Sequence, residues 1–600
     1  MEHNMILSAS GWRKVFAESG DQFDSGENIG ETNTFLCALI AESFVNYVQN
    51  KTRKTKPVIV LGRDSRPTGN QMATAMIKAM LYHKVKIQYL GITAAPEIMA
   101  YSKNADGFIY ISASHNPIGH NGIKFGMNDG GVLEASQAKL LAEDFKSKLL
   151  TVNCQPHAEE LLNLTDEKKY AKVLTESKEF KKLAVSSYEK FIKTVITGTE
   201  KEKQQEEFFS LLKECVKYNP LSIVCDMNGS ARSLSIDSSF VQKCSLGFTA
   251  INAKPGEIVH EIIPEPENLV WCAEKMNELQ KSGNPAALLG YMPDCDGDRG
   301  NMVYWNEKQD KAVPIAAQEV FALCVMAELA FEYWKNPKTK KLAVAVNCPT
   351  SMRIEEICKV FDAKVFRGEV GEANVVNLAR EKRNEGFIVR ILGEGSNGGN
   401  ITWPSCVRDP VATVFAAVKL LCIRDTVNKK GRVQEGIFHL WCRLSGQENK
   451  YKPDFTLSDV IETLPKYSTT GVSEKRAVLD VKTEDKGHLK LRFQKIFMQE
   501  WNARKQELLE KYSIAGYECI TTNGTKETRN ATEWNNGNGG LKVLFKDKSG
   551  NPVAFIWMRP SGTEKVFRVL CDVKGDRPQT EASLLEWERA LLQKADSNLA

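Results

Sequence analysis

The sequence has little excess charge of either sign. Its 600 residues carry 80 Lys and Arg against 75 Asp and Glu, so the formal net charge is only +5. The one short basic cluster, residues 51–56, has no aromatic residue between its charges. We expect this cluster to be a solvated loop, and nucleic acid is a poor candidate partner for a chain with this charge balance.

Cysteine motifs are also missing. None of the 15 cysteines forms a CxxC pair, and several lie within apolar strands or helices, as Cys225, Cys324 and Cys422 do. Cysteines placed in this way are typically reduced, buried side chains of a protein in a reducing compartment. The spacing therefore argues against a disulfide framework, and no Cys or His pattern indicates zinc.

Neither a secretory signal nor a membrane-spanning run is visible. Residues 1–7 contain no basic segment followed by an apolar one. The most apolar stretch, residues 314–334, is interrupted by four Gln and Glu residues, which predicts a core helix rather than a membrane span. We expect a cytoplasmic protein with no membrane partner.

The chain is too long for one hydrophobic core, and strand-like and helix-like segments alternate along it in three rounds. The rounds cover residues 58–111, 221–290 and 315–392. A repeated strand–helix–strand order predicts mostly parallel sheets with right-handed crossovers, and so three similar α/β domains. No residue identity links the rounds, so the repeat is one of architecture.

Two segments interrupt this rhythm. Residues 152–219 are rich in Lys and Glu and contain helical pieces such as residues 188–196, and they are predicted to be partly a surface insertion and partly a linker. Residues 456–467 resemble a second linker. Beyond it, longer helices, an Asn/Gly-rich loop at residues 523–540 and two strands predict a smaller C-terminal α+β domain. The predicted domains are residues 1–185, 186–312, 313–465 and 466–600.

A first polar loop follows the short apolar strand 108–111. It contains Ser112, Ser114, His115 and Asn116. Pro117 then ends the strand and holds the loop in a turn, because proline has no N–H to donate. Hydroxyls and an imidazole at the carboxyl end of a strand are how α/β proteins present chemistry. From these residues alone, Ser112 and Ser114 are equal candidates for a reactive group.

A second loop, after the apolar run 286–290, contains three alternating aspartates, Asp294, Asp296 and Asp298. In an extended chain their carboxylates lie on one side, and Gly297 permits a tight wrap. Three hard oxygen ligands suit Mg²⁺, and without a cation the three charges would repel one another. The alternative is a solvated acidic turn. No Glu stands at the position that closes a calcium EF-hand.

A third loop, residues 393–399, follows the strand 387–392 and contains Glu394 and Ser396. These two side chains could accept and donate hydrogen bonds to vicinal sugar hydroxyls, and the glycines let the backbone approach a ligand. A plain Gly-rich turn is the alternative. No Gly-Lys-Ser/Thr follows, so the loop is not a Walker P-loop.

A fourth loop, residues 559–565, offers a guanidinium, two hydroxyls and a glycine, with Arg568 close by. Such a set predicts a compact phosphate nest, and an exposed turn is the alternative. A supporting segment is Gly62–Arg66 at the end of the first strand. Its Arg63 could fix the backbone or a phosphoryl group, or form an ion pair with Asp64, and the residues favour neither.

In this order, the four loops resemble the motifs of the α-D-phosphohexomutase superfamily. Its phosphoglucomutase/phosphomannomutase members carry a Ser-His-Asn-Pro loop, an Asp-x-Asp-Gly-Asp-Arg metal loop, a Gly-Glu-x-Ser sugar loop and an Arg-Pro-Ser-Gly-Thr-Glu phosphate loop. The resemblance implies three similar mixed-sheet α/β domains and a smaller C-terminal α+β domain around a central cleft. The four predicted domains would carry the phosphoserine, the metal, the sugar and the phosphate loops, in that order.

The resemblance also implies a role for each matching residue. Ser114 would be the phosphoserine, and it would bind Mg²⁺ together with Asp294, Asp296 and Asp298. Lys124 or His115 would be the general acid and base, with Arg13 as a further catalytic candidate. Residues 367–371 resemble a further loop on the sugar side. The implied substrate-binding residues are Glu394, Ser396, Arg559, Ser561, Gly562, Thr563, Arg568 and Arg299, of which Arg299 would also support the metal loop.

Some positions depart from the family pattern. Cys295 and Lys565 stand where proline is frequent, and Pro410 follows Asp409 where glycine is common. The sugar loop has Asn397-Gly-Gly in place of the familiar variants. The preferred sugar is therefore open.

The implied activity is interconversion of hexose 1-phosphate and hexose 6-phosphate, of glucose or mannose, through phosphorylated Ser114 and a bound hexose 1,6-bisphosphate. The cofactor would be Mg²⁺ and the partners small sugar phosphates, with the chain a monomer or a dimer. The alternatives are a phosphoglucosamine-type mutase, a non-catalytic sugar-phosphate sensor and a Mg²⁺-dependent sugar phosphatase. The complete set of transfer residues argues against a sensor, and phosphate release would distinguish a phosphatase.

Overall fold

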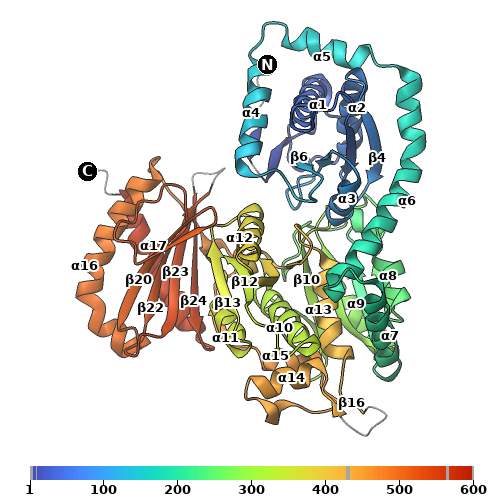
Figure 1. The fold of residues 1–600 in the computed structure, drawn as a ribbon. Coiled ribbons are helices and arrows are strands. Elements are labelled where there is room, and N and C mark those ends of the chain that lie inside the picture. The colour runs from blue at the N-terminus through green and yellow to red at the C-terminus, as the bar shows by residue number, and fades with distance from the viewer. Residues whose placement is uncertain (1–3, 9, 428–432, 562–565, 598–600) are drawn as a thin grey trace. The chain divides into compact units, whose positions relative to one another are not determined.

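The computed structural model describes residues 4–8, 10–427, 433–561 and 566–597. The chain forms two compact units, which are considered separately (Figure 1). Unit 1 comprises residues 1–315 and 401–418, and unit 2 comprises residues 316–400 and 419–600. Within the described residues, no helix is both long and apolar enough to cross a membrane.

The first sheet of unit 1 is mixed. Its strands are β1 (Ile6–Ser8), β2 (Gly11–Val15), β3 (Val58–Arg63), β4 (Lys86–Ile92), β5 (Gly107–Ile111) and β6 (His120–Met127). The order across the sheet is β1-β2-β6-β5-β3-β4. Strand β3 pairs in parallel with both β4 and β5, whereas β6 runs antiparallel to β5. The packed helices are α1 (Gly30–Thr52), α2 (Gly69–Tyr82), α3 (Ala95–Tyr101) and α4 (Ala135–Leu149).

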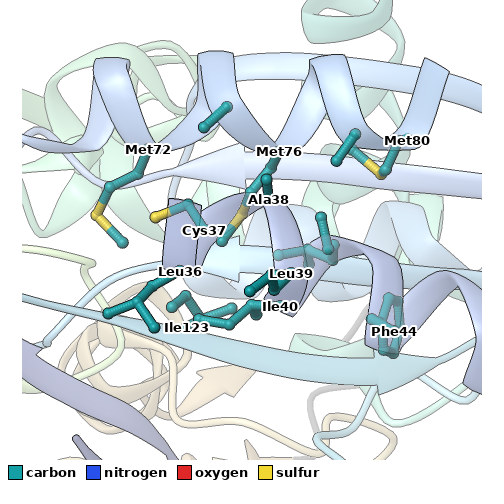
Figure 2. Packing of buried hydrophobic residues seen from close by; sticks show 14 of the residues in the cluster. Leu36, Cys37, Ala38, Leu39, Ile40, Phe44, Met72, Met76, Met80 and Ile123 are labelled. Carbon is teal, nitrogen blue, oxygen red and sulfur yellow. The ribbon is translucent and has the colours of Figure 1, made fainter. Parts of the chain in front are cut away.

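The core between α1, α2 and this sheet follows from the helical spacing of apolar residues. Met72, Met76 and Met80 recur every four residues along α2, so they lie on one face of the helix. Figure 2 shows this face against α1, whose own apolar residues continue toward Ile123 on β6. Methionine fills irregular gaps well, which suits a helix pair that must cover a twisted sheet.

The second sheet of unit 1 repeats the arrangement. Its strands are β7 (Ser222–Asp226), β8 (Gly247–Ile251), β9 (Ala287–Pro293), β10 (Gly300–Asn306) and β11 (Lys311–Pro314), and its helices include α8 (Asp237–Lys243) and α9 (Val270–Lys281). Strand β7 lies between β8 and β9, parallel to both, and β10 runs antiparallel to β9. Strands β7, β8, β9 and β10 thus correspond to β3, β4, β5 and β6.

The segment at residues 152–219 is helical throughout most of its length, not a linker. It forms α5 (Cys154–Asn163), α6 (Glu167–Thr197) and α7 (Glu202–Tyr218). Asp166 caps α6 by accepting hydrogen bonds from two backbone N–H groups of the first turn, and Gly198 ends it in the left-handed conformation. Figure 1 shows α6 as one long helix that runs from the end of α5 past β4 and α3 to α7, and the predicted domain boundary at residue 185 falls inside it.

In unit 2, the third repeat again has its first strand between the second and the third. Strand β12 (Leu342–Asn347) pairs in parallel with β13 (Lys364–Gly368) and with β14 (Ile388–Gly393). The other elements of this region are α10 (Ala317–Lys335), α11 (Arg353–Val360), α12 (Glu372–Asn384), β16 (Thr426–Val427), β17 (Val433–Gln434), α14 (Ile437–Leu444) and α15 (Leu457–Glu462). Strand β15 (Ile401–Thr402) and most of α13 (Pro410–Cys422) belong to unit 1. The threefold α/β repeat predicted from the sequence is confirmed.

The C-terminal part of unit 2 is a different, antiparallel sheet. Its main path is β18 (Tyr467–Thr469), β24 (Val566–Lys574), β23 (Pro552–Pro560), β22 (Leu541–Lys546), β20 (Gly516–Asn523) and β21 (Lys526–Arg529), and β19 (Val478–Asp480) pairs with β24. The helices α16 (Lys486–Tyr512) and α17 (Pro578–Ser597) share a buried core with this sheet. This confirms the predicted smaller α+β domain.

Glu588 of α17 gives a stability prediction for this C-terminal core. Its side chain is buried, and neither carboxyl oxygen has a hydrogen-bond partner among the described residues. Burial raises the pKa of Glu588 well above its ordinary value. The folded chain therefore keeps a proton that the unfolded chain has lost, so this group makes the fold less stable as pH rises above the ordinary glutamate range.

We predict that Glu588→Gln removes this pH dependence. Relative to the variant, the unfolding temperature of the wild-type C-terminal core should fall by several degrees between about pH 5 and pH 8. Glu586→Gln is the matched control, because Glu586 lies in the same helix and its side chain is 77% exposed. Parallel pH profiles for wild type and Glu588→Gln, measured by calorimetry, would contradict the prediction.

Candidate active site and metal centre

The loop that follows β5 is held in place by one buried arginine, Arg66. The guanidinium of Arg66 donates to four backbone carbonyls of the loop, those of Ser114 (2.7 Å), Asn116 (2.6 Å), Pro117 (2.7 Å) and His120 (3.2 Å). The carboxylate of Asp64 lies 3.3 Å from Arg66 Nε and accepts the backbone N–H of Arg66. Arg63 donates to the backbone carbonyl of Asp64, whereas the carboxylate of Asp64 pairs with Arg66.

Ser114 is distinguished from Ser112 by its backbone and by its partner. Ser114 has φ of +54°, a left-handed conformation that costs a non-glycine residue about 1–2 kcal/mol. Its N–H donates to the Ser112 hydroxyl at 2.8 Å, and its own hydroxyl donates to Asp294 Oδ2 at 2.6 Å. The Ser114 hydroxyl is also 3.4 Å from His115 Nδ1. Ser112 donates to Asp296 and supports the loop, whereas Ser114 presents its oxygen to the aspartates.

The three aspartates of the β9–β10 connection converge as predicted. All three are buried, and one oxygen from each lies within 4.8 Å of the others. Burial and the two neighbouring aspartates raise the pKa of Asp294 well above its ordinary value. Burial acts on Asp298 in the same sense, but Arg408, Lys124 and Arg299 outweigh it and lower the pKa of Asp298.

Two cations offset part of this buried negative charge. Lys124, which is itself buried on β6, places its Nζ 2.7 Å from Asp296 Oδ2 and 3.3 Å from Asp298 Oδ2. Arg408 Nη2 lies 3.1 Å from Asp298 Oδ1. Lys124 therefore contacts the aspartate loop directly.

The remaining groups of this cluster fit a small divalent cation. Asp296 Oδ1 is buried and has no hydrogen-bond partner among the described residues, which is costly unless a cation is near. The donors are carboxylate oxygens, the ligand type that Mg²⁺ prefers. Gly297 has φ of +68°, and a Cβ there would lie 2.3 Å from Arg232 Cδ, so only glycine allows the wrap. The donor set thus suits Mg²⁺.

Positively charged side chains lie close to His115, the residue that follows Ser114. Arg13, on β2 opposite Gly122 of β6, has its pKa lowered by burial and by nearby Arg299. Nε of Arg13 and Nε of Arg299 have no hydrogen-bond partner among the described residues. The pKa of His115 is held well below its ordinary value by Arg299 and by burial. Cations that lie together in this way favour an anion such as a phosphoryl group.

The sugar-loop residues lie in unit 2, after β14. Glu394 Oε1 accepts hydrogen bonds from Asn347 Nδ2 (3.0 Å) and from the backbone N–H of Gly371 (2.7 Å). Glu394 Oε2 accepts from Asn397 Nδ2 at 3.1 Å. Both Glu394 and Ser396 are buried. The glutamate predicted to bind a sugar is therefore already fixed by its own surroundings.

The phosphate loop joins β23 and β24, also in unit 2. Arg559 and Arg568 are directly opposite each other in the β23–β24 pairing, and the Ser561 N–H donates to Val566 O at 2.8 Å. Gly562 and Thr563, predicted to hold phosphate, lie outside the described residues. Arg559 Nε lies 3.1 Å from Glu369 Oε1.

Three of these contacts are not predicted by the sequence. Arg66 belongs to the supporting segment Gly62–Arg66, in which only Arg63 is a candidate from the sequence. Arg408 meets Asp298 across 110 residues, and Glu369, within the sugar-side segment 367–371, meets Arg559 from another sheet. No local spacing signals either contact, because each arises from how the sheets pack.

Comparison with known proteins agrees with this geometry. Residues 11–151 match the family model "Phosphoglucomutase/phosphomannomutase, alpha/beta/alpha domain I", and residues 322–435 match domain III of the same family. A phosphoglucomutase/phosphomannomutase of Thermococcus kodakarensis is 24% identical over 548 residues, 90% of this chain and 91% of that protein. A phosphoglucosamine mutase of Methanococcus vannielii is 26% identical over 321 residues, 53% of this chain, and the match spans only 60% of that relative's length.

Solved structures show the same fold. A phosphoglucomutase/phosphomannomutase family protein from Burkholderia thailandensis superposes with a TM-score of 0.59, 15% identity and coverage of 99% of this chain and 98% of the other. Parafusin, a phosphoglucomutase from Paramecium in its open form, also gives 0.59, with 13% identity and coverage of 99% and 96%. The chain belongs to the α-D-phosphohexomutase superfamily.

We predict that Mg²⁺ raises the unfolding temperature of the wild-type chain and that Asp296→Asn abolishes this rise. A ligand at about 100 times its Kd stabilises the folded state by about 2.7 kcal/mol. Asp310→Asn, at an exposed turn of the same unit, is the control and should respond like wild type. An unchanged Mg²⁺ response in Asp296→Asn and in the double variant Asp294→Asn/Asp298→Asn would remove the metal from this loop.

Proposed function

We propose that the chain interconverts hexose 1-phosphate and hexose 6-phosphate, of glucose or mannose, through phosphorylated Ser114 and a bound hexose 1,6-bisphosphate. The observation that carries this proposal is the Ser114 hydroxyl, which donates to Asp294 at 2.6 Å inside a buried aspartate cluster. Phosphoryl transfer depends mainly on positioning and on neutralising charge, and this cluster offers both.

In the first half of the reaction, the bond between Ser114 Oγ and phosphorus would break as a free sugar hydroxyl bonds to that phosphorus. The proton of the sugar hydroxyl would pass to Lys124 on β6 or to His115 of the serine loop, and the released Ser114 Oγ would take up a proton to become a hydroxyl again. Arg66 holds the loop, and Arg13 and Arg299 face the negative charge of the phosphoryl group. When bound by the three aspartates and the phosphoserine, Mg²⁺ would supply further neutralisation of that charge.

The second half would use the same residues in reverse. The bisphosphate would rotate within the site without dissociating, and its other phosphoryl group would then be transferred to Ser114 Oγ. Glu394 and Ser396 would then hold the sugar hydroxyls in both orientations. The phosphate that is not being transferred would be bound by Arg559, Ser561, Gly562, Thr563 and Arg568.

A phosphoglucosamine-type mutase is the second candidate. The relative from Methanococcus vannielii is named as such, and so is one from Nautilia profundicola that is 27% identical over 372 residues. The Asn397-Gly-Gly sequence of the sugar loop also departs from the familiar variants. The two candidate substrates differ in the amino group of glucosamine phosphate, which the sugar loop would have to bind or exclude.

We predict that Ser114→Ala abolishes isomerisation and leaves no phosphorylated peptide by mass spectrometry. The variant lacks the hydroxyl oxygen that we propose carries the phosphoryl group between the two half-reactions. Ser102→Ala is the control, because Ser102 is equally buried in unit 1 and its hydroxyl bonds only to Met99 O in the described structure. Full activity of Ser114→Ala would exclude Ser114 as the phosphoryl carrier.

We further predict that kcat/KM is higher for glucose 1-phosphate or mannose 1-phosphate than for glucosamine 1-phosphate. Sites that hydrogen-bond a substrate hydroxyl discriminate strongly against analogues that leave buried polar groups unpaired. The three 1-phosphates should be compared with the same enzyme preparation and the same bisphosphate activator. A preference for glucosamine 1-phosphate would make the chain a phosphoglucosamine-type mutase instead.

A further inference from the structure

One carboxylate in unit 2, that of Glu369, contacts the phosphate-loop arginine. Glu369 follows β13 and is buried, and its Oε1 lies 3.1 Å from Arg559 Nε. The same oxygen accepts the backbone N–H of Val370 at 2.8 Å. Oε2 accepts the Thr522 hydroxyl at 2.8 Å and the Gly540 N–H at 2.5 Å. Both oxygens are thus fully used, so the carboxylate is held in one orientation.

The same short segment also reaches the sugar-loop glutamate. Two residues after Glu369, the backbone N–H of Gly371 donates to Glu394 Oε1 at 2.7 Å. Gly371 has φ of +124°, a conformation that side chains rarely allow, and a Cβ there would lie 3.2 Å from Asn374 Nδ2. Residues 369–371 therefore connect the group proposed to bind the sugar with the group proposed to bind phosphate.

The C-terminal domain supports this segment through its Asn/Gly-rich loop. Gly540 and Thr522, which hold Glu369, are joined by Asn536, whose side chain donates to Gly540 O at 2.7 Å and to Thr522 O at 3.3 Å. Lys490 of α16 stabilises the loop, because its Nζ donates hydrogen bonds to Asn536 Oδ1 (2.6 Å), Gly537 O (2.8 Å) and Gly539 O. Burial lowers the pKa of Lys490 to about 7. The Asn/Gly-rich loop noted in the sequence thus supports the residues that bind Glu369.

We propose that Glu369 is a positioning residue that orients Arg559 toward the non-transferring phosphate and sets its distance from Glu394. This inference rests on the proposed function. Glu369 engages Arg559 at Nε, and the arginine side chain keeps 30% of its surface exposed. The Nε–H group makes no hydrogen bond among the described residues, so the contact is an ion pair. A guanidinium held by charge on its Nε side can present its two terminal nitrogens as a fork that matches a phosphate.

A competing arrangement would have Glu369 occupy Arg559 until the substrate displaces it. Displacement would have to break contacts to Thr522, Gly540 and Val370 and leave a buried carboxylate unsatisfied, which is costly. The orienting role keeps all of those bonds. The two roles predict opposite changes in substrate affinity when the charge is removed.

The test compares Glu369→Gln with wild type, using the full chain, Mg²⁺ and glucose 6-phosphate or mannose 6-phosphate as the probe. The orienting role predicts that KM and the calorimetric Kd for the probe rise about tenfold, whereas kcat changes little. Glu369→Asp, which keeps the charge, should recover part of the affinity. Glu518→Gln is the control, because Glu518 is a buried carboxylate of the same unit that pairs with Arg529 and Lys546 instead.

Unchanged binding in Glu369→Gln, or tighter binding, would overturn the inference, and tighter binding would establish the competing role. A loss of affinity equal to that of Glu518→Gln would also overturn it, because that result would reflect general damage to the fold. If wild type neither turns over nor binds any hexose phosphate, the proposed function fails. If wild type does both and Glu369→Gln matches it, only the present inference fails.

Discussion

Three carboxylates buried within 4.8 Å of one another are the constraint on which the rest of this site depends. Their mutual repulsion in a poorly solvated place can be tolerated only if positive charge is brought to them. Lys124 arrives from β6 and Arg408 from the segment before α13, and one oxygen of Asp296 is left for a further cation. The Ser114 hydroxyl bonds to the same aspartate cluster. A cation that neutralises the aspartates therefore also lies beside the proposed phosphoryl carrier.

The topology explains how such a cluster can form. In each of the three α/β repeats, the first strand lies between the second and the third, with all three parallel. The serine, aspartate and sugar loops each follow the third strand of their own repeat, at β5, β9 and β14. The loop after the third strand of each repeat therefore carries a different set of polar side chains. In unit 1, this arrangement brings the serine loop and the aspartate loop into hydrogen-bonding contact.

The parts of this picture that are local in the chain could be predicted from the sequence. Strand–helix alternation predicted the three repeats, and the alternating aspartates predicted a shared ligand set. The choice between Arg63 and Arg66 could not be made, because it depends on which side chain reaches the carbonyls after β5. The contacts of Arg408 and Glu369 depend on packing between distant segments. Helical pieces were predicted in residues 152–219, but not the full extent of α5, α6 and α7, because their Lys- and Glu-rich faces resemble a solvated linker.

The most direct test of the account is to follow isomer formation and inorganic phosphate in one reaction, with hexose 1-phosphate, Mg²⁺ and a trace of hexose 1,6-bisphosphate. A phosphoryl group that shuttles between Ser114 and the sugar is never given to water. We therefore predict that hexose 6-phosphate accumulates to equilibrium with no net release of inorganic phosphate. Release of phosphate in proportion to substrate loss would contradict the account and indicate a phosphatase.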